Sequence, residues 1–192
     1  MKTAAILAAV LIIIIAIMLG FSAIQYLPSA PGIDTSHDIS GTRDLILDEQ
    51  DLQQLGMAAN GCQTDDGYSN IVDSTLGQYS FCNYTITALN GTEVIVELQK
   101  FADYEALNGS YQYSSLHLYS AQGIISENDF GDQSRFRANN VNDYGGQYND
   151  PNVHYYHLWI CKGLYLIHIT SGGPVEAEDY VARIGRQILS KF

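Results

Sequence analysis

The sequence predicts an α+β domain, in which helices cover an antiparallel sheet of about five strands, preceded by one N-terminal transmembrane helix. Three features lead to this prediction: an uncharged apolar run at the N-terminus, two stretches with the pattern of β-hairpins, and an amphipathic C-terminal segment. Reading these features in chain order gives the element order α-β-β-α-β-β-β-α for the domain. The hydrophobic content of 46% agrees with a folded domain rather than a disordered chain.

The N-terminal segment, residues 1–27, predicts a transmembrane signal anchor. Ala4–Leu27 carries no charge, and a helix of this length spans about 36 Å, enough for a bilayer core of about 30 Å. Lys2 precedes the run, so the positive-inside rule places the N-terminus in the cytoplasm. The prediction is a single-pass protein of the cell membrane with its C-terminal domain outside; a cleaved signal peptide remains the alternative.

A linker and a first helix follow. Residues 28–43 are rich in Pro, Gly, Ser and Asp, which is typical of a solvated linker, and residues 44–192 then form the outer domain. The segment 44–57 has leucines at helical spacing and predicts a short helix that ends at Gly56. The polar, glycine-containing segment 60–69 predicts a loop.

The segment 79–101 predicts the first hairpin. Two β-prone runs flank Asn90-Gly91, the preferred dipeptide of a two-residue type I′ turn. Pairing across that turn sets Asn83 against Leu98, on the face that also carries Val94 and Val96. This places Asn83 on the predicted buried face.

A helix, a short strand and a second hairpin are expected next. The segment 103–122 predicts a helix, and 128–139 predicts a turn followed by a strand. In 153–170 a turn at Lys162-Gly163 sets His157 directly opposite His168, on the less apolar face of the hairpin. The segment 174–192 predicts an amphipathic closing helix, with its apolar stripe at Val181, Ile184, Ile188 and Leu189.

Cysteines and glycosylation triplets agree with a location outside the cell. Three cysteines allow three pairings, which the sequence leaves open; Cys62 with Cys82 is the preferred pair because it closes a short loop. Three Asn-x-Ser/Thr triplets provide candidate glycosylation sites. These candidates are Asn83, Asn90 and Asn108.

The charge balance argues against anionic partners. After Lys2 the chain has 21 acidic and eight basic residues, a net charge of −13, which repels nucleic acid and anionic lipid headgroups. No recognised catalytic motif is present, so no catalytic residue, enzyme activity or cofactor is predicted.

Two groups of residues are candidates for binding. The opposed pair His157 and His168 can share a metal ion if another side chain supplies a further ligand. A Tyr-, Asn- and Gly-rich loop of about 14 residues precedes the second hairpin and suits adaptable recognition. The binding candidates in or beside this loop are Tyr144, Tyr148, Tyr155 and Trp159.

Four segments carry a resemblance to a known family: "LILDEQDLQQLG" as an opening helix, "FGDQSRFR" as a Gly-Asp turn into a strand, "WICKGLYLIHI" as a hairpin, and "AEDYVARIGRQIL" as a closing helix. Together they resemble the PsbP/Mog1-like domains of cell-envelope lipoproteins and of extracellular sensor domains. The resemblance implies a helix-covered antiparallel sheet with a binding or accessory role. It carries over no catalytic residue, and the chain lacks the lipidation cysteine of the lipoproteins.

The resulting hypothesis is a non-enzymatic, membrane-anchored domain that binds an extracellular protein or small-molecule ligand, or serves as an accessory subunit. Its contact with the membrane runs through residues 4–27. One alternative is a structural subunit of a surface layer or filament that associates through its apolar helix and its sheet edges. The other is a metal-binding protein that uses the cross-strand histidine pair.

Overall fold

The computed structural model describes residues 39–67, 77–116, 123–139 and 150–192. The chain divides into two compact units, Met1–Ser36 and His37–Phe192, and all described residues belong to the second. The predicted anchor, Ala4–Leu27, therefore lies outside the described residues. Among those residues, no helix has the length and apolar character needed to cross a membrane.

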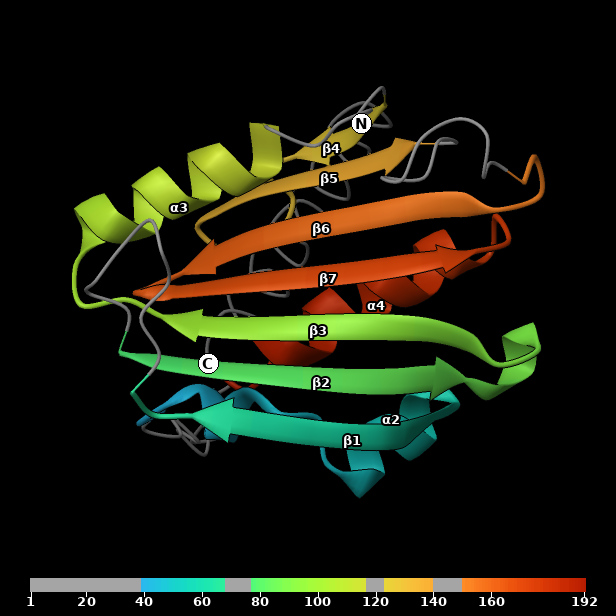
Figure 1. The fold of residues 1–192 in the computed structure, drawn as a ribbon, viewed down its shortest axis with the longest axis horizontal. Helices are drawn as coiled ribbons and strands as arrows, with labels where there is room; N and C mark the ends of the chain where they lie inside the picture. Colours follow the sequence, from blue (N-terminus) through green and yellow to red (C-terminus); the bar gives the residue numbers. More distant parts are fainter. Residues whose placement is uncertain (1–38, 68–76, 117–122, 140–149) are drawn as a thin grey trace, which may run out of the picture. The chain divides into compact units, whose positions relative to one another are not determined.

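A single antiparallel sheet organises the described part of the chain (Figure 1). The α+β class and the antiparallel pairing are confirmed, but the strands described number seven rather than five. Their spatial order is β1-β2-β3-β7-β6-β5-β4. The strands are β1 (Met57–Asp65), β2 (Gln78–Ile86), β3 (Thr92–Lys100), β4 (Ile124–Glu127), β5 (Gln133–Asn139), β6 (His154–Lys162) and β7 (Tyr165–Gly173).

Strand β1 accounts for part of the difference, because the sequence predicts a loop where it lies. Almost all of its residues are exposed, so the strand has no alternation of apolar and polar side chains to reveal it. Backbone pairing with β2 and the disulfide between Cys62 and Cys82, which lie directly opposite each other, fasten it to the sheet. The four-residue strand β4 at the other edge is also exposed and was not predicted.

Helices cover the two faces of the sheet unequally (Figure 1). Helix α4 (Ala177–Leu189) packs on β6 and β7. Of its predicted apolar stripe, Val181, Ile184 and Ile188 are completely buried in the main core, whereas Leu189 is partly buried against it. Helix α2 (Glu49–Leu55) contributes to the same core. Helix α3 (Tyr104–Leu116) lies across part of the opposite face, which we call the outer face.

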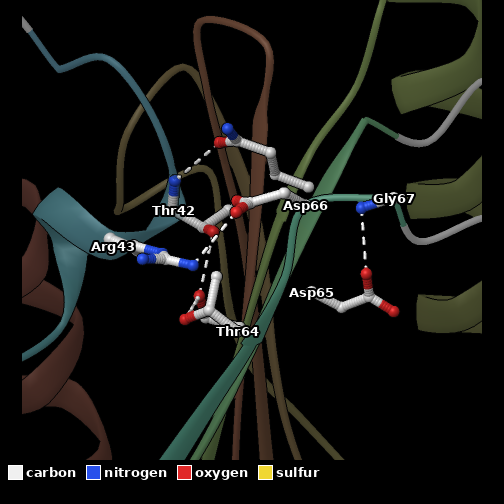
Figure 2. A network of polar contacts seen from close by, with 8 residues as sticks. Thr42, Arg43, Thr64, Asp65, Asp66 and Gly67 are labelled. Atoms are coloured by element: carbon white, nitrogen blue, oxygen red, sulfur yellow. Dashed lines mark hydrogen bonds and ion pairs between the residues drawn. The ribbon is translucent and has the colours of Figure 1, made fainter.

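The predicted first helix is in fact two pieces. A 3₁₀ turn, η1 (Thr42–Leu45), precedes α2, which begins at the capping box formed by Asp48 and Asp51 and ends at Gly56 in the left-handed conformation, as predicted. Figure 2 shows η1 beside the end of β1, where Arg43 forms an exposed ion pair with Asp66. Thr42, placed in the linker by the sequence, is fully buried and accepts a hydrogen bond from the Ser80 hydroxyl.

The register of the first hairpin differs from the prediction. A 3₁₀ turn at Thr87–Leu89, η2, precedes Asn90-Gly91, so five residues rather than two connect the strands. Asn83 consequently pairs with Ile95 instead of Leu98. Because side chains alternate along a strand, this shift of three positions moves Asn83 from the predicted buried face to the half-buried outer face.

The second hairpin is shifted as well, but by two positions. Lys162 pairs with Tyr165, so the loop is Gly163-Leu164, with Gly163 in the left-handed conformation at φ 55°. An even shift keeps every side chain on its predicted face, and the more apolar face does meet the main core. His157 therefore lies opposite Thr170, and Trp159 lies opposite His168.

The Gly-Asp turn before β5 holds this hairpin loop. The Asp132 carboxylate accepts hydrogen bonds from the Gly163 backbone N–H at 2.8 Å and from the Lys162 ammonium at 2.9 Å. The Asp132 backbone N–H in turn donates to the Cys161 carbonyl at 2.8 Å. Gly131 permits this close approach, because a β-carbon there would lie 2.5 Å from the Cys161 carbonyl oxygen.

Candidate ligand-binding site

The outer face of the sheet is divided between a covered part and a more open part. Helix α3 closes over a small second core at one end, formed by Phe101, Leu107, Tyr111, Trp159, Cys161 and Leu166. Next to this core, the outer-face side chains of β2 and β3 are half-buried rather than buried. The candidate site lies along the border between the two parts.

A chain of polar side chains crosses this border over four strands. On β3, Glu97 accepts a hydrogen bond from the Tyr79 hydroxyl of β2 at 2.7 Å. The other carboxylate oxygen of Glu97 lies 2.8 Å from Nδ1 of His168, its direct neighbour on β7. Nε2 of His168 then lies 3.4 Å from Nδ1 of His157 on β6, a long hydrogen bond.

Aromatic stacking fixes the two imidazole rings. Trp159 stacks on His168 with ring centroids 4.7 Å apart and on His157 at 5.4 Å, with both pairs of rings nearly parallel. Trp159 itself is 1% exposed and belongs to the second core under α3. The rigid core thus holds one side of the histidine pair, while Glu97 holds the other.

The surroundings of Glu97 and His157 determine whether these two side chains are charged. Burial alone would raise the pKa of Glu97, but the hydrogen bond and charge of His168 and the hydrogen bond from Tyr79 bring it below its usual value. Burial, reinforced by the neighbouring charge of His168 and then by Arg137, lowers the pKa of His157 to about 3. Glu97 is therefore ionised and His157 neutral at physiological pH.

A hollow of about 290 Å³ opens beside His157. Three direct neighbours across β3, β7 and β6 form its centre, namely Ile95, Thr170 and His157. Tyr155 lies at one side, with its ring packed so closely over Gly172 that a β-carbon there would come within 3.1 Å of it. The exposed Glu93 lies at the rim.

This arrangement provides a largely buried but accessible imidazole at an open cavity. His157 is 8% exposed, and its Nε2 atom makes no hydrogen bond within the described part of the chain. Strongly shifted pKa values in a concave site are typical of functional positions. A larger groove of about 580 Å³ lies between β4, β5 and α4, and its lining includes the charged residues Asp129, Glu178, Asp179 and Arg186.

The structure brings the predicted metal pair together, although diagonally rather than directly opposite. Nδ1 of His168 already faces Glu97, and its Nε2 faces His157, so both ring nitrogens of His168 have partners. Within the described residues, no three His, Cys, Asp or Glu side chains are grouped so that they can hold a metal ion.

The structure also shows the positions of the three cysteines and of the three candidate glycosylation sites. The Cys62–Cys82 disulfide is the expected pair, and Cys161 is a buried free thiol whose pKa burial raises to about 12. Asn90 and Asn108 are exposed, on the hairpin loop and on α3, so both remain candidates for glycosylation. Asn83 is half-buried and accepts a hydrogen bond from the Asn60 side chain at 3.1 Å.

Of the predicted binding-loop residues, Tyr155 does line the hollow, but Trp159 is a core residue and has no surface to offer a ligand. Trp159 follows the loop in sequence, but its position on β6 places its side chain in the second core. Tyr144 and Tyr148 lie outside the described residues.

The sequence did not identify Glu97, Tyr79, Ile95 or Thr170 as site residues. Glu97 and His168 are 71 positions apart and meet only because β3 pairs with β7. Local hairpin patterns do not specify this pairing. The one local signal was that Glu93 and Glu97 share a face of the first hairpin.

Comparisons with known proteins find little similarity. No protein-family model matches the chain, and no curated protein matches it. Among solved structures, it is similar to the extracellular domain of PknH from Mycobacterium tuberculosis, at 10% sequence identity and a TM-score of 0.47. That match covers 78% of this chain and 95% of the PknH domain.

Proposed function

We propose that this protein is a non-catalytic, membrane-anchored domain that binds a small ligand outside the cytoplasm, in the hollow beside His157. The observation that carries the proposal is His157 itself, which lines an open cavity while its Nδ1 atom lies 3.4 Å from His168, the neighbour that in turn contacts Glu97. Burying such a polar chain costs stability compared with apolar side chains of the same size. The position of these polar side chains next to a hollow favours a role in recognition.

The lining of the hollow suits binding. It combines two apolar surfaces, Ile95 and the Tyr155 ring, with a few polar groups that can fix the orientation of a ligand, His157 and the Thr170 hydroxyl. Small-molecule sites typically have this mixture of apolar walls and few polar groups. The volume of about 290 Å³ corresponds to a compact molecule.

Two features support a location outside the cytoplasm. The Cys62–Cys82 disulfide is of the kind that persists in oxidising compartments. The uncharged run Ala4–Leu27 has the length of a membrane anchor. We propose that this run holds the domain at the outer surface of the cell membrane.

Native mass spectrometry tests the binding function. The full-length chain, purified in detergent, is incubated with the small-molecule fraction of its source cells and weighed under native conditions. We expect a non-covalent adduct that is lost in Thr170→Phe, because the added ring fills the hollow. Gln99→Phe is the matched control, since Gln99 is a half-buried outer-face residue of β3 that does not line the hollow.

Two results would contradict the proposal. One is a chain that carries no adduct under any condition in which it is folded. The other is an adduct that Thr170→Phe and Gln99→Phe retain equally, because the ligand would then lie elsewhere.

A further inference from the structure

We propose that the groove between β4, β5 and α4 docks a basic amphipathic helix of another protein. The groove is lined by residues of the main core, so it lies on the opposite face of the sheet from the hollow beside His157. The inference therefore goes beyond the proposed function and does not depend on it.

The helices on the main-core side leave one end of the sheet without a helix. Helix α4 packs on β6 and β7, and α2 packs next to β1. Beyond β6 the sheet continues through β5 to its edge at β4 (Figure 1), and no further helix of the described residues lies on this side. The groove of about 580 Å³, with α4 on one side and β4 and β5 on the other, is thus the next position for a helix.

The groove has an apolar floor and apolar side chains at its margin. The buried rings of Phe130 and Phe136 line it, next to Ala182 of α4. Ile125 of β4 and Val175, which precedes α4, line the same groove and are 38% and 59% exposed. Large aliphatic side chains left in solvent around an apolar floor are typical of a protein-docking surface. The apolar stripe of an amphipathic helix fills such a groove.

The charged groups of the groove favour a cationic partner. Asp129, Glu178 and Asp179 supply three carboxylates, against the one guanidinium of Arg186. Arg186 itself lies over the Phe130 ring, 5.3 Å from the ring centroid. Lysine or arginine side chains on both sides of the apolar stripe of a helix would meet these carboxylates.

The carboxylates on the two sides of the groove differ in what else explains them. Glu178 and Asp179 lie in the first turn of α4, where acidic residues also stabilise the helix through its dipole, and Asp179 lies 3.8 Å from Arg183. Asp129 lies in the turn between β4 and β5, and its side chain forms no ion pair or hydrogen bond within the described part of the chain. A cation in the groove would give Asp129 a partner.

Two synthetic helical peptides test the proposal. Both have about 14 residues, a length of about 21 Å, and the same Leu/Ala face, but one carries Lys at the flanking positions and the other Glu. The full-length chain is held in phosphatidylcholine nanodiscs, and fluorescence anisotropy measures the affinities at pH 7, with empty nanodiscs as the control for lipid binding. We expect the Lys peptide to bind at least about tenfold more tightly than the Glu peptide.

One pair of variants tests the apolar contact. Val175→Ser should weaken binding of the Lys peptide severalfold, because it removes an exposed apolar side chain from the margin of the groove. Ile124→Ser is the matched control: Ile124 of β4 is 58% exposed, about as much as Val175, but does not line the groove. The control should leave the affinity unchanged.

A second set of variants tests the charges. Asp129→Asn and Glu178→Gln should each weaken binding of the Lys peptide severalfold. Glu105→Gln removes an acid from the first turn of α3, on the outer face, and should have no effect. An effect of Glu105→Gln equal to the other two would mean that only the net charge of the domain attracts the peptide, which overturns the proposal.

Methyl NMR locates the bound peptide. With labelled isoleucine methyl groups, the Lys peptide should shift the resonance of Ile125, which lines the groove, and leave that of Ile95 on the outer face unchanged. Equal affinity of the two peptides, no binding of either, or an unshifted Ile125 resonance overturns the proposal. None of these results affects the hollow beside His157, which the native-mass experiment tests separately.

Discussion

At the scale of single residues, His157 combines the roles of a core side chain and a recognition group. It stacks on Trp159, is 8% exposed, and still reaches the hollow. A neutral imidazole is required for this combination, because a charged ring at this depth would pay a large desolvation cost. The pH dependence of stability should therefore reveal its environment.

The pKa of His157 predicts how stability changes with acid. Unfolded histidine binds a proton below about pH 6.5, whereas folded His157 does so only below about pH 3. Between these values the unfolded state binds more protons, so His157 adds a loss of up to about 1.4 kcal/mol of unfolding free energy per pH unit of acidification. Urea denaturation at pH 7 and pH 5 measures the loss, which should be smaller in His157→Gln. Glu97 contributes little between pH 7 and pH 5, because an unfolded glutamate takes up its proton only near its ordinary pKa of 4.5 and folded Glu97 does so at still lower pH. An equal loss in variant and wild type would show that His157 is solvated.

A pair of glycines provides a second test at this scale. Gly131 and Gly163 both have left-handed φ angles, 59° and 55°. A β-carbon at Gly131 would contact the Cys161 carbonyl, whereas one at Gly163 would meet nothing within 4 Å. Thermal or urea unfolding should show that Gly131→Ala costs at least about 2 kcal/mol, and Gly163→Ala only about 1 kcal/mol for the backbone conformation. Equal costs would mean that the Gly-Asp turn does not press against the hairpin.

At the scale of elements, strand β1 depends on its disulfide more than on side-chain burial. Its residues are almost all exposed, and Cys62–Cys82 closes a loop of 20 residues in sequence. Cys62→Ser should lower the unfolding free energy by about 2–4 kcal/mol and increase hydrogen exchange along β1. Reduction of the wild-type protein should have the same effect, and the reductant should not change Cys62→Ser further. Protection of β1 that survives the loss of the disulfide would contradict this account.

The two hairpins show what the sequence could and could not predict. Both hairpins and the closing helix follow from local periodicity. Strands β2 and β3 and helix α4 each bury one face, whereas β6 and β7 alternate between the main core and the outer face. The pairing register of the two hairpins could not be predicted in the same way. Register depends on the length of the loop, and the dipeptides Asn90-Gly91 and Lys162-Gly163 do not determine that length. The observed register of the second hairpin differs from the predicted one by two positions, so the histidines keep their predicted face. In the first hairpin the difference is three positions, so Asn83 lies on the face opposite to the predicted one.

The candidate site was predictable only in part for the same reason. The histidine pair and Tyr155 lie on one hairpin, so local alternation brings them to one face. Glu97 and Ile95 come from β3, and their position beside β7 is a long-range pairing. Strand β1 was missed because an exposed edge strand has no apolar alternation.

At the scale of the whole molecule, we propose that the domain lies outside the cell membrane. On intact cells an external protease should therefore remove the domain and leave a short fragment that contains Ala4–Leu27. An immunoblot against a C-terminal tag measures this loss, with a cytoplasmic protein as the control for lysis. Protection of the domain in intact cells, followed by digestion after lysis, would place it inside.

Methyl NMR tests whether the outer face binds a small ligand beside His157. In the full-length chain with labelled isoleucine methyl groups, Ile95 reports on the hollow and Ile125 on the groove between β4, β5 and α4. On addition of the small-molecule fraction of the source cells, the account predicts a saturable shift of the Ile95 resonance and none of Ile125. A shift of Ile125 alone, or of neither residue, would contradict it.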